Sequence, residues 1–290
     1  MTMTKNALIL GGGGALGVSW ETGVLAGLQQ AGVDVTGADL IVGTSAGSVV
    51  GTQIAQGSTL AELLDEHHNG RIGTEMPMDF DVQNLMAVFA KWAAYPEMTV
   101  ERCAEIGRLA IASKTASEEA WIASFEEFIG PEWPERDLRL TTVDAESGEF
   151  RAWTRDDGVD IRRAVASSCA VPGMFPCVRA GDRLYQDGGV RSGTNADLAA
   201  GYDAVLIIAP IGARDDSIDP LLGRTTRREA DELRARGSQV ELIFPDKSAL
   251  EAMGFNRMDS TRRGVSADVG VEQGRELAKR LEAAWSKTPA

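Results

Sequence analysis

A pentapeptide of the form Gly-x-Ser-x-Gly, residues 43–47, directly follows the short apolar run 40–42. The apolar run predicts a buried strand, and the segment after the pentapeptide predicts a helix. A sharp strand-to-helix turn needs glycine wherever a Cβ would clash, and Gly43 and Gly47 flank Ser45 in this way. Such a turn would lift the serine hydroxyl clear of the backbone. The pattern indicates covalent acyl chemistry, and a plain turn is the alternative for so short a motif.

A second unit of the same kind opens the chain. Residues 7–10 predict a buried strand, glycines follow, and apolar residues then recur at helical spacing to about residue 31. Two successive strand–helix units favour a parallel sheet with crossover helices. Consecutive N–H groups of Gly12, Gly13 and Gly14, beside the positive end of a helix dipole, can hold a phosphate or a developing oxyanion.

The same glycines also fit a dinucleotide-binding fingerprint, taken as Gly12-x-Gly14-x-x-Gly17. Asp34 or Asp39, about 20 residues further along, would then be the acid that binds a ribose hydroxyl. A nucleotide-binding module is therefore one alternative, and a tight turn without a ligand is another.

The remaining pattern predicts one domain over residues 1–290, with the motifs in a core of about 6–210 and a helical C-terminal region of about 246–290. Alternating and helical periodicities place the elements along the chain. The expected helices cover about 59–68, 81–93, 99–113, 117–129, 161–168, 224–236 and 261–285. The expected strands cover about 138–143, 149–154, 175–179, 183–186, 203–209 and 239–244.

Charge and cysteine content limit the partners. The net charge is −14, so no basic excess exists to displace counterions from nucleic acid, and at most transient peripheral contact with an anionic membrane is expected. The three cysteines, Cys103, Cys169 and Cys177, predict free thiols in a reducing compartment. No apolar run is long enough for a signal sequence or a membrane span, which favours a cytoplasmic protein.

A serine nucleophile needs a general base, which is usually histidine. The chain has two histidines, His67 and His68, which are adjacent in a polar stretch and are expected at a solvated helix end. A carboxylate is the next candidate. Asp187 precedes Gly188 and Gly189 at the end of a short predicted strand, although Asp-Gly is also a common structural turn.

Four segments in this order resemble the patatin-like phospholipase family. Residues 12–17 are similar to its glycine-rich oxyanion loop, and residues 43–47 to its nucleophile elbow. Residues 164–176, Ala-Val-Ala-Ser-Ser-Cys-Ala-Val-Pro-Gly-Met-Phe-Pro, are similar to the family's Ala-Ser-x-Ala-x-Pro-x-x-Phe-Pro stretch, and residues 187–189 to the segment with its dyad aspartate.

The resemblance implies an α/β fold of three layers, α/β/α, with a mostly parallel central sheet. It also implies a serine acyl hydrolase, a lipolytic esterase or phospholipase A-like enzyme, that cleaves acyl esters of lipids without a metal or other cofactor. Ser45 would be the nucleophile and Asp187 the general base, with the oxyanion held by Gly12, Gly13 and Gly14. The other motif glycines would support the turns: Gly17, Gly43, Gly47, Gly188 and Gly189.

Several features leave the substrate open. Leu16 stands where the family often has Arg or Lys, so phospholipids and neutral esters both remain candidates, and Asn195 receives no role. Methionine and aromatic residues between Met76 and Met98 could line an acyl channel, but the core face of a helix is the expected use. A catalytically silent lipid-binding member is a third alternative, and the oligomeric state is open.

The terminal helix is expected to cap the sheet, with subunit pairing as the alternative. Its apolar positions are Val265, Val269, Leu277, Leu281 and Trp285.

Overall fold

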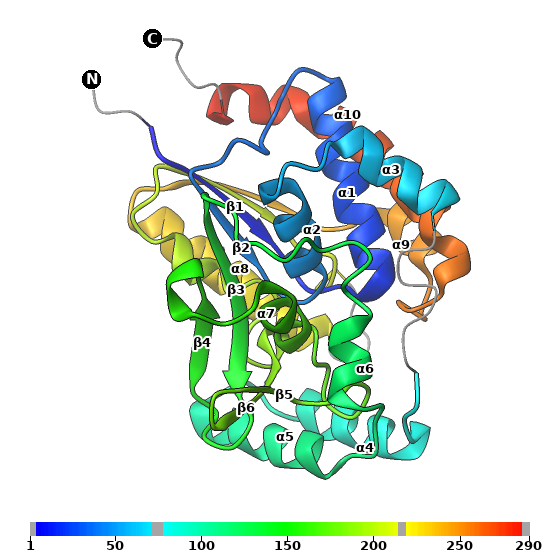
Figure 1. Ribbon diagram of the computed structural model, residues 1–290. Helices are drawn as coiled ribbons and strands as arrows, with labels where there is room; N and C mark the ends of the chain where they lie inside the picture. The colour runs from blue at the N-terminus through cyan, green and yellow to red at the C-terminus, as the bar shows by residue number, and fades with distance from the viewer. Residues whose placement is uncertain (1–3, 71–77, 214–218, 286–290) are drawn as a thin grey trace.

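A computed structural model describes residues 4–70, 78–213 and 219–285, which form eight strands and ten α-helices (Figure 1). The strands are β1 Asn6–Leu10, β2 Leu40–Gly43, β3 Asp137–Asp144, β4 Phe150–Trp153, β5 Val178–Ala180, β6 Arg183–Asp187, β7 Ala204–Ile208 and β8 Gln239–Ile243. The helices are α1 Gly14–Gln30, α2 Ala46–Ala55, α3 Leu60–Asn69, α4 Val82–Ala93, α5 Val100–Ala112, α6 Glu118–Ala123, α7 Ile161–Ser168, α8 Asp219–Ala235, α9 Lys247–Met253 and α10 Arg263–Trp285.

The strands form one sheet in the order β5-β6-β3-β2-β1-β7-β8, with β4 paired to β3. Strands β3, β2, β1, β7 and β8 run parallel, whereas β4, β5 and β6 join through antiparallel pairs. The chain adds strands on one side of β1 first and on its other side later. Ligands in sheets of this kind bind at the carboxyl ends of the strands near such a reversal.

Alternate residues of the central strands face opposite layers of helices. Leu8 and Ile41 are buried in the cluster that includes residues of α1 and α2. Ile9 and Val42 are buried in the cluster that includes residues of α8. The sequence therefore alternates between two cores, and the predicted α/β/α arrangement with a mostly parallel sheet is confirmed.

Most of the predicted helices and strands are present within a few residues of the expected bounds. The helix predicted over 117–129 is shorter, because α6 ends at Ala123 and turns follow it. The Ser124 hydroxyl donates to the Trp121 carbonyl oxygen at 2.7 Å, a local bond that competes with continued helix.

The terminal helix α10 packs on α1 rather than capping the sheet, so this expectation is wrong. An added Cβ at Gly23 would lie 2.1 Å from the Ala267 carbonyl oxygen, and one at Gly274 would lie 2.3 Å from the Val24 carbonyl oxygen. Glycine therefore lets the two backbones approach closely. The buried face of α10 combines small residues with the fully buried Leu281, whereas Val265, which was expected to be apolar contact surface, is 49% exposed.

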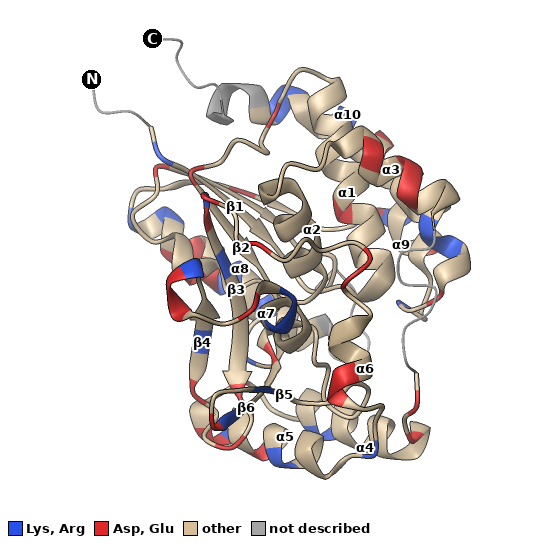
Figure 2. Ribbon diagram, viewed as in Figure 1, with Lys and Arg blue, Asp and Glu red and all other residues tan. Residues whose placement is uncertain are grey.

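Charged residues lie mainly on the outer helices and loops, whereas α2 and strands β1, β2 and β7 carry no Lys, Arg, Asp or Glu (Figure 2). Across the described ranges, no helix combines the length and apolar character needed to cross a membrane. The uncharged centre of the molecule is where the two glycine motifs meet.

Candidate active site

The two glycine motifs lie side by side at the carboxyl ends of adjacent parallel strands. The first follows β1 and the second follows β2, and these strands pair from Ala7 with Leu40 to Leu10 with Gly43. A Cβ added at Gly12 would lie 3.5 Å from the Ser45 Cβ. The parallel sheet therefore brings the glycine loop against the serine, as the two strand–helix units predicted.

Ser45 occupies the sharp turn between β2 and α2 in an unusual conformation. Its φ is 52° and its ψ is −116°, in the region that serine rarely adopts. An added Cβ at Gly43 would lie 2.5 Å from the Ser48 Cα, and one at Gly47 would lie 2.1 Å from the Leu10 carbonyl oxygen. Both glycines are thus required by close backbone contacts, and they hold the strained serine in place.

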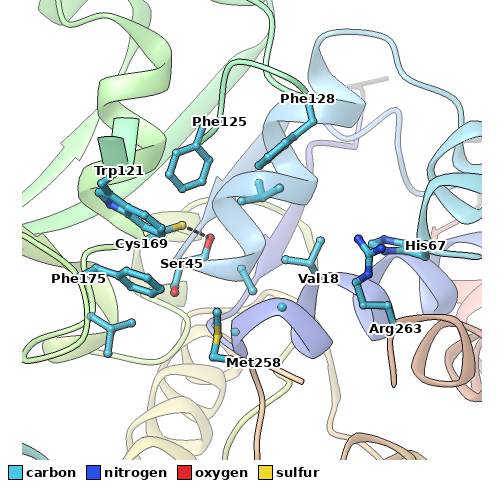
Figure 3. A pocket seen from close by; sticks show the side chains of 15 residues that line it. Val18, Ser45, His67, Trp121, Phe125, Phe128, Cys169, Phe175, Met258 and Arg263 are labelled. Carbon is cyan, nitrogen blue, oxygen red and sulfur yellow. Dashed lines mark hydrogen bonds between the residues drawn. The ribbon is translucent and has the colours of Figure 1, made fainter. Parts of the chain in front are cut away.

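The backbone of Ser45 is anchored by residues of the 164–176 segment. The Ser45 N–H donates to the Ser168 hydroxyl at 3.0 Å. The Cys169 thiol donates to the Ser45 carbonyl oxygen at 3.2 Å, the bond drawn in Figure 3, and the Ser48 hydroxyl donates to the same oxygen at 2.6 Å. These contacts leave the Ser45 side chain free to point elsewhere.

The Ser45 hydroxyl lies near the carboxylate of Asp187, at the end of β6, and its hydrogen-bonding interaction lowers the pKa of that carboxylate. Asp187 is 3% exposed, and its other contact is the Gly189 N–H, 2.7 Å from Oδ1. Burial raises the pKa of Asp187 to about 7, and the bonds from Gly189 and Ser45 oppose that rise. An aspartate with this pKa accepts a proton from a hydroxyl more readily than an exposed one does.

Three backbone N–H groups near Ser45 lack an acceptor within the described residues. Two belong to Gly13 and Gly14 at the start of α1, and the third belongs to Ala46 at the start of α2. The N–H of Gly12 donates to the Gly193 carbonyl oxygen at 2.9 Å. The prediction that Gly12 supplies an oxyanion donor is therefore wrong, because its N–H is already used.

Gly12 instead helps to fix the loop, together with a buried acid that sequence reasoning missed. Glu21 of α1 is fully buried and accepts a hydrogen bond from the Gly11 N–H at 2.8 Å. Burial raises the pKa of Glu21 well above its ordinary value, and the bond from Gly11 opposes the rise. The hydrogen bonds of Gly11 and Gly12 therefore fix the loop, and the free N–H groups of Gly13 and Gly14 keep their positions.

Asn195 is a second residue that sequence reasoning missed. It is fully buried, with φ of 50°, a conformation that Asn tolerates better than most residues. Its amide nitrogen lies 3.1 Å from the Thr44 hydroxyl and 3.3 Å from the Gly188 carbonyl oxygen. Asn195 therefore ties the turn before Ser45 to the turn after Asp187.

An apolar cavity of about 70 Å³ opens beside Ser45 (Figure 3). Trp121 and Phe175 stack at 3.9 Å between ring centroids on one side, with Phe125 in edge-to-face contact with Trp121. The full lining is Gly14, Ala15, Val18, Ser45, Ala46, Val49, His67, Trp121, Phe125, Phe128, Cys169, Val171, Phe175, Met258 and Arg263. Residues from five other parts of the chain thus surround the serine.

None of the described methionine and aromatic residues between 78 and 98 lines this cavity. Val88 and Trp92 of α4 are buried in a separate apolar cluster, whereas Met86 is 61% exposed. The core-face interpretation holds for the buried residues. Met76 lies outside the described residues.

His67 is buried, so its expected place at a solvated helix end is wrong. It is 6% exposed, and its Nδ1 and Nε2 each lie 3.2 Å from a hydroxyl, those of Ser19 and Thr22. Burial, with the charges of Arg263 and His68, lowers the pKa of His67 to about 4. Its hydrogen bonds go to α1 and not to Ser45.

The acids proposed for a nucleotide ribose do not lie near the glycine loop. Asp39 accepts a hydrogen bond from the Asn6 N–H at the start of β1, at 2.8 Å. Asp34 bonds the backbone and hydroxyl of Thr36 in the loop before β2. Both acids precede β2 at the amino ends of the strands, so they cannot serve as the ribose acid.

The fold and the elbow place the chain in the class of α/β acyl hydrolases. The sequence model of the patatin-like phospholipase family matches residues 8–200, about two thirds of the chain. The chain therefore belongs to the patatin-like phospholipase family. No curated protein matches it at a significant level.

Among solved structures, the chain is similar to VipD from Legionella pneumophila. The TM-score is 0.50 at 13% identity, and the match covers 96% of this chain and 67% of that chain. The type III effector ExoU gives a TM-score of 0.39 at 14% identity over 94% of this chain and 53% of that chain. At this identity the likeness to VipD concerns the fold alone.

Proposed function

We propose that this chain is a serine hydrolase that cleaves acyl esters of lipids through a dyad of Ser45 and Asp187. The observation that carries the proposal is the position of Ser45 on a strained turn beside an apolar cavity, with its hydroxyl near the buried carboxylate of Asp187. Family membership supports the same class of reaction. The proposed nucleophile, the proposed base and a cavity for the substrate thus lie next to one another.

In the first half-reaction, the Ser45 oxygen attacks the ester carbonyl carbon while the Asp187 carboxylate accepts the hydroxyl proton. The carbonyl oxygen becomes an oxyanion, which the free N–H groups of Gly13, Gly14 and Ala46 are placed to stabilise. Each such donor contributes a factor of about 10²–10³ in rate. The intermediate then collapses, the bond to the alcohol breaks, and protonated Asp187 returns its proton to the leaving alkoxide.

In the second half-reaction, water replaces the alcohol. Asp187 accepts a proton from the water, whose oxygen attacks the acyl carbon, and the Ser45 oxygen leaves with the proton from Asp187. The products are a carboxylic acid and the regenerated serine. The same buried carboxylate serves as base and acid in turn, which a pKa near neutral pH favours.

The aromatic side of the cavity suits the acyl chain. Trp121, Phe125, Phe128 and Phe175 offer apolar ring surface next to Ser45 (Figure 3). Apolar surface of this kind gains free energy when it covers methylene groups, at about 25 cal/mol per Å² of buried area. An alkyl ester is therefore a better substrate than a short polar one.

A fluorophosphonate probe tests the proposal directly, because it forms a covalent bond with an activated serine. We expect the full chain to be labelled and Ser45→Ala to lose both labelling and hydrolysis of 4-nitrophenyl esters. Ser147→Ala is the matched control, since Ser147 is exposed in the turn between β3 and β4 and should leave both unchanged. Equal labelling of Ser45→Ala and the wild type would exclude the dyad. Lipid binding without labelling would indicate a catalytically silent member.

A further inference from the structure

Arg263, the first residue of α10, lines the same cavity as Ser45 and is 6% exposed. Its Nη2 donates to the Gly70 carbonyl oxygen at 2.8 Å. Its Nε and Nη1 are buried without an acceptor within the described residues. Because nearly all buried polar groups in proteins are paired, unpaired donors beside a cavity require an explanation.

The charge of Arg263 is also unpaired in this part of the structure. Within the described residues, no carboxylate lies within ion-pair distance of its guanidinium. Burial lowers the pKa of Arg263, and the more distant charge of Glu66 opposes this. The adjacent ring of His67 is neutral near pH 7, since its pKa is about 4. A buried cation without a counterion destabilises a fold, which points to an anion that binds there.

The cavity has two chemically different ends (Figure 3). The rings of Trp121 and Phe175 lie on one side of Ser45. Val18 lies beyond Ser45 in the other direction, followed by His67 and Arg263, with the guanidinium beside the histidine ring. A molecule whose ester group lies at Ser45 would therefore present one arm to aromatic surface and the other to a cation.

We propose that Arg263 binds a phosphate or carboxylate group within this cavity, so that the preferred substrate is an ester with one apolar arm and one anionic arm. The proposal rests on the proposed function of Ser45 for the position of the ester. The described residues give the guanidinium a single hydrogen bond, to Gly70, so Nε and Nη1 remain available to an anion. Guanidinium groups bind both oxyanions through short charge-assisted hydrogen bonds.

The first experiment compares esters matched in their acyl chain and different in charge. One pair is a monoacylglycerol and its 3-phosphate, and the other is 4-nitrophenyl hexanoate and the mono-4-nitrophenyl ester of adipic acid. We expect the wild type to prefer at least one anionic member. Arg263→Met should reduce the anionic-to-neutral ratio of kcat/KM by about tenfold to a hundredfold, as expected for one charge-assisted bond. Arg263→Lys should retain part of the preference.

Arg275→Met is the matched control, because Arg275 lies on the exposed side of the same helix and bonds Gln30. It should leave the ratio unchanged. The two ester pairs distinguish a phosphate on the alcohol arm from a carboxylate on the acyl arm. An unchanged ratio in Arg263→Met, with hydrolysis of neutral esters intact, would overturn the inferred substrate preference and leave the proposed function of Ser45 standing.

A second experiment needs no catalysis. Inorganic phosphate should raise the thermal unfolding temperature of the wild type and of Ser45→Ala, but not that of Arg263→Met. The Arg263→Met protein should fold at least as stably as the wild type, because it lacks the unpaired buried charge. A phosphate effect that depends on Arg263 without any ester preference would support the site and identify a free anion as its occupant. If neither the ester ratio nor the phosphate effect depends on Arg263, the site does not exist.

Discussion

Asp187→Asn separates the catalytic role of this residue from its effect on stability. Asparagine has the same shape, can accept the hydrogen bond of the Gly189 N–H, and can donate one to Ser45. It cannot take up a proton from the serine. We expect hydrolysis to fall by about 10²–10⁴, the usual contribution of a general base, while the folded protein becomes more stable at pH 8.

The size of the stability gain follows from the pKa. Burial raises the pKa of Asp187 from 3.8 to about 7. Between these values the unfolded chain has lost the proton and the folded chain retains it, so the wild type loses stability as the pH rises through this window. At about 1.4 kcal/mol per pH unit, the loss reaches about 4 kcal/mol above pH 7 and about 2 kcal/mol at pH 5. The asparagine side chain of the variant does not titrate, so Asp187→Asn escapes this loss.

Urea unfolding of both proteins at pH 5, 6, 7 and 8 measures the difference, and other titrating groups cancel in the comparison. Asp182→Asn is the control, because Asp182 is exposed on the turn before β6. The wild-type kcat/KM should rise with pH and level off above about 7, where Asp187 is ionised. A stability difference that does not vary with pH, together with a flat activity profile, would refute the raised pKa and the dyad with it.

Two further predictions concern the surrounding residues. Asn195→Ala should lower the free energy of unfolding in urea by about 2–3 kcal/mol and reduce kcat, since buried groups of Thr44 and Gly188 lose their partner. Asn195→Gly, which accepts the positive φ but also lacks the amide, should lose the same activity with less strain; full activity in it would contradict a positioning role. His67→Gln should keep hydrolysis near the wild-type rate, because the ring bonds α1 and not Ser45. A loss of about 10² or more in 4-nitrophenyl ester hydrolysis would identify His67 as the base.

The predictable part of the site is the part that depends on local backbone chemistry. Gly43 is required by a contact within the strand–helix turn and Gly47 by a contact with Leu10 at the end of the adjacent strand, and such turns have a sequence pattern. The choice of Asp187 followed from the scarcity of histidine and from the family resemblance. The two side chains lie close enough, across 142 positions of the chain (187 − 45), for Ser45 to lower the pKa of Asp187.

The unpredicted part depends on partners that are distant in sequence. The N–H of Gly12 is occupied by the Gly193 carbonyl, and no local pattern announces that bond. The sequence assigns Asn195 no role, yet its side chain joins the two turns of the site. His67 lies in a polar segment, but its ring is buried and forms hydrogen bonds with two hydroxyls of α1. In each case a tertiary contact overrides the local signal.

The terminal helix shows the same limit and explains how the cavity acquires its cation. Apolar periodicity predicts a face that includes Val265 and Leu281, but only Leu281 of this pair is buried, beside small residues that let α10 approach α1. Since α1 begins at the glycine loop, a helix packed closely along it carries its own first residue, Arg263, to the cavity wall. The preceding segment adds Met258, and its Arg257 carbonyl accepts the Leu16 N–H at 3.0 Å.

Both Met258 and Arg263 lie beyond residue 200, where the match to the family ends. The residues matched to the family include the glycine loop and the turns at Ser45 and Asp187. The proposed catalytic residues and the cavity wall formed by Met258 and Arg263 therefore come from different parts of the chain. A change in the segment between α9 and α10 can therefore alter which ester arm fits while the hydrogen bond between Ser45 and Asp187 stays intact. Substrate preference in this protein should accordingly follow the residues that close the cavity from the C-terminal side, because the proposed dyad and oxyanion donors would contact only the ester group common to all candidate substrates.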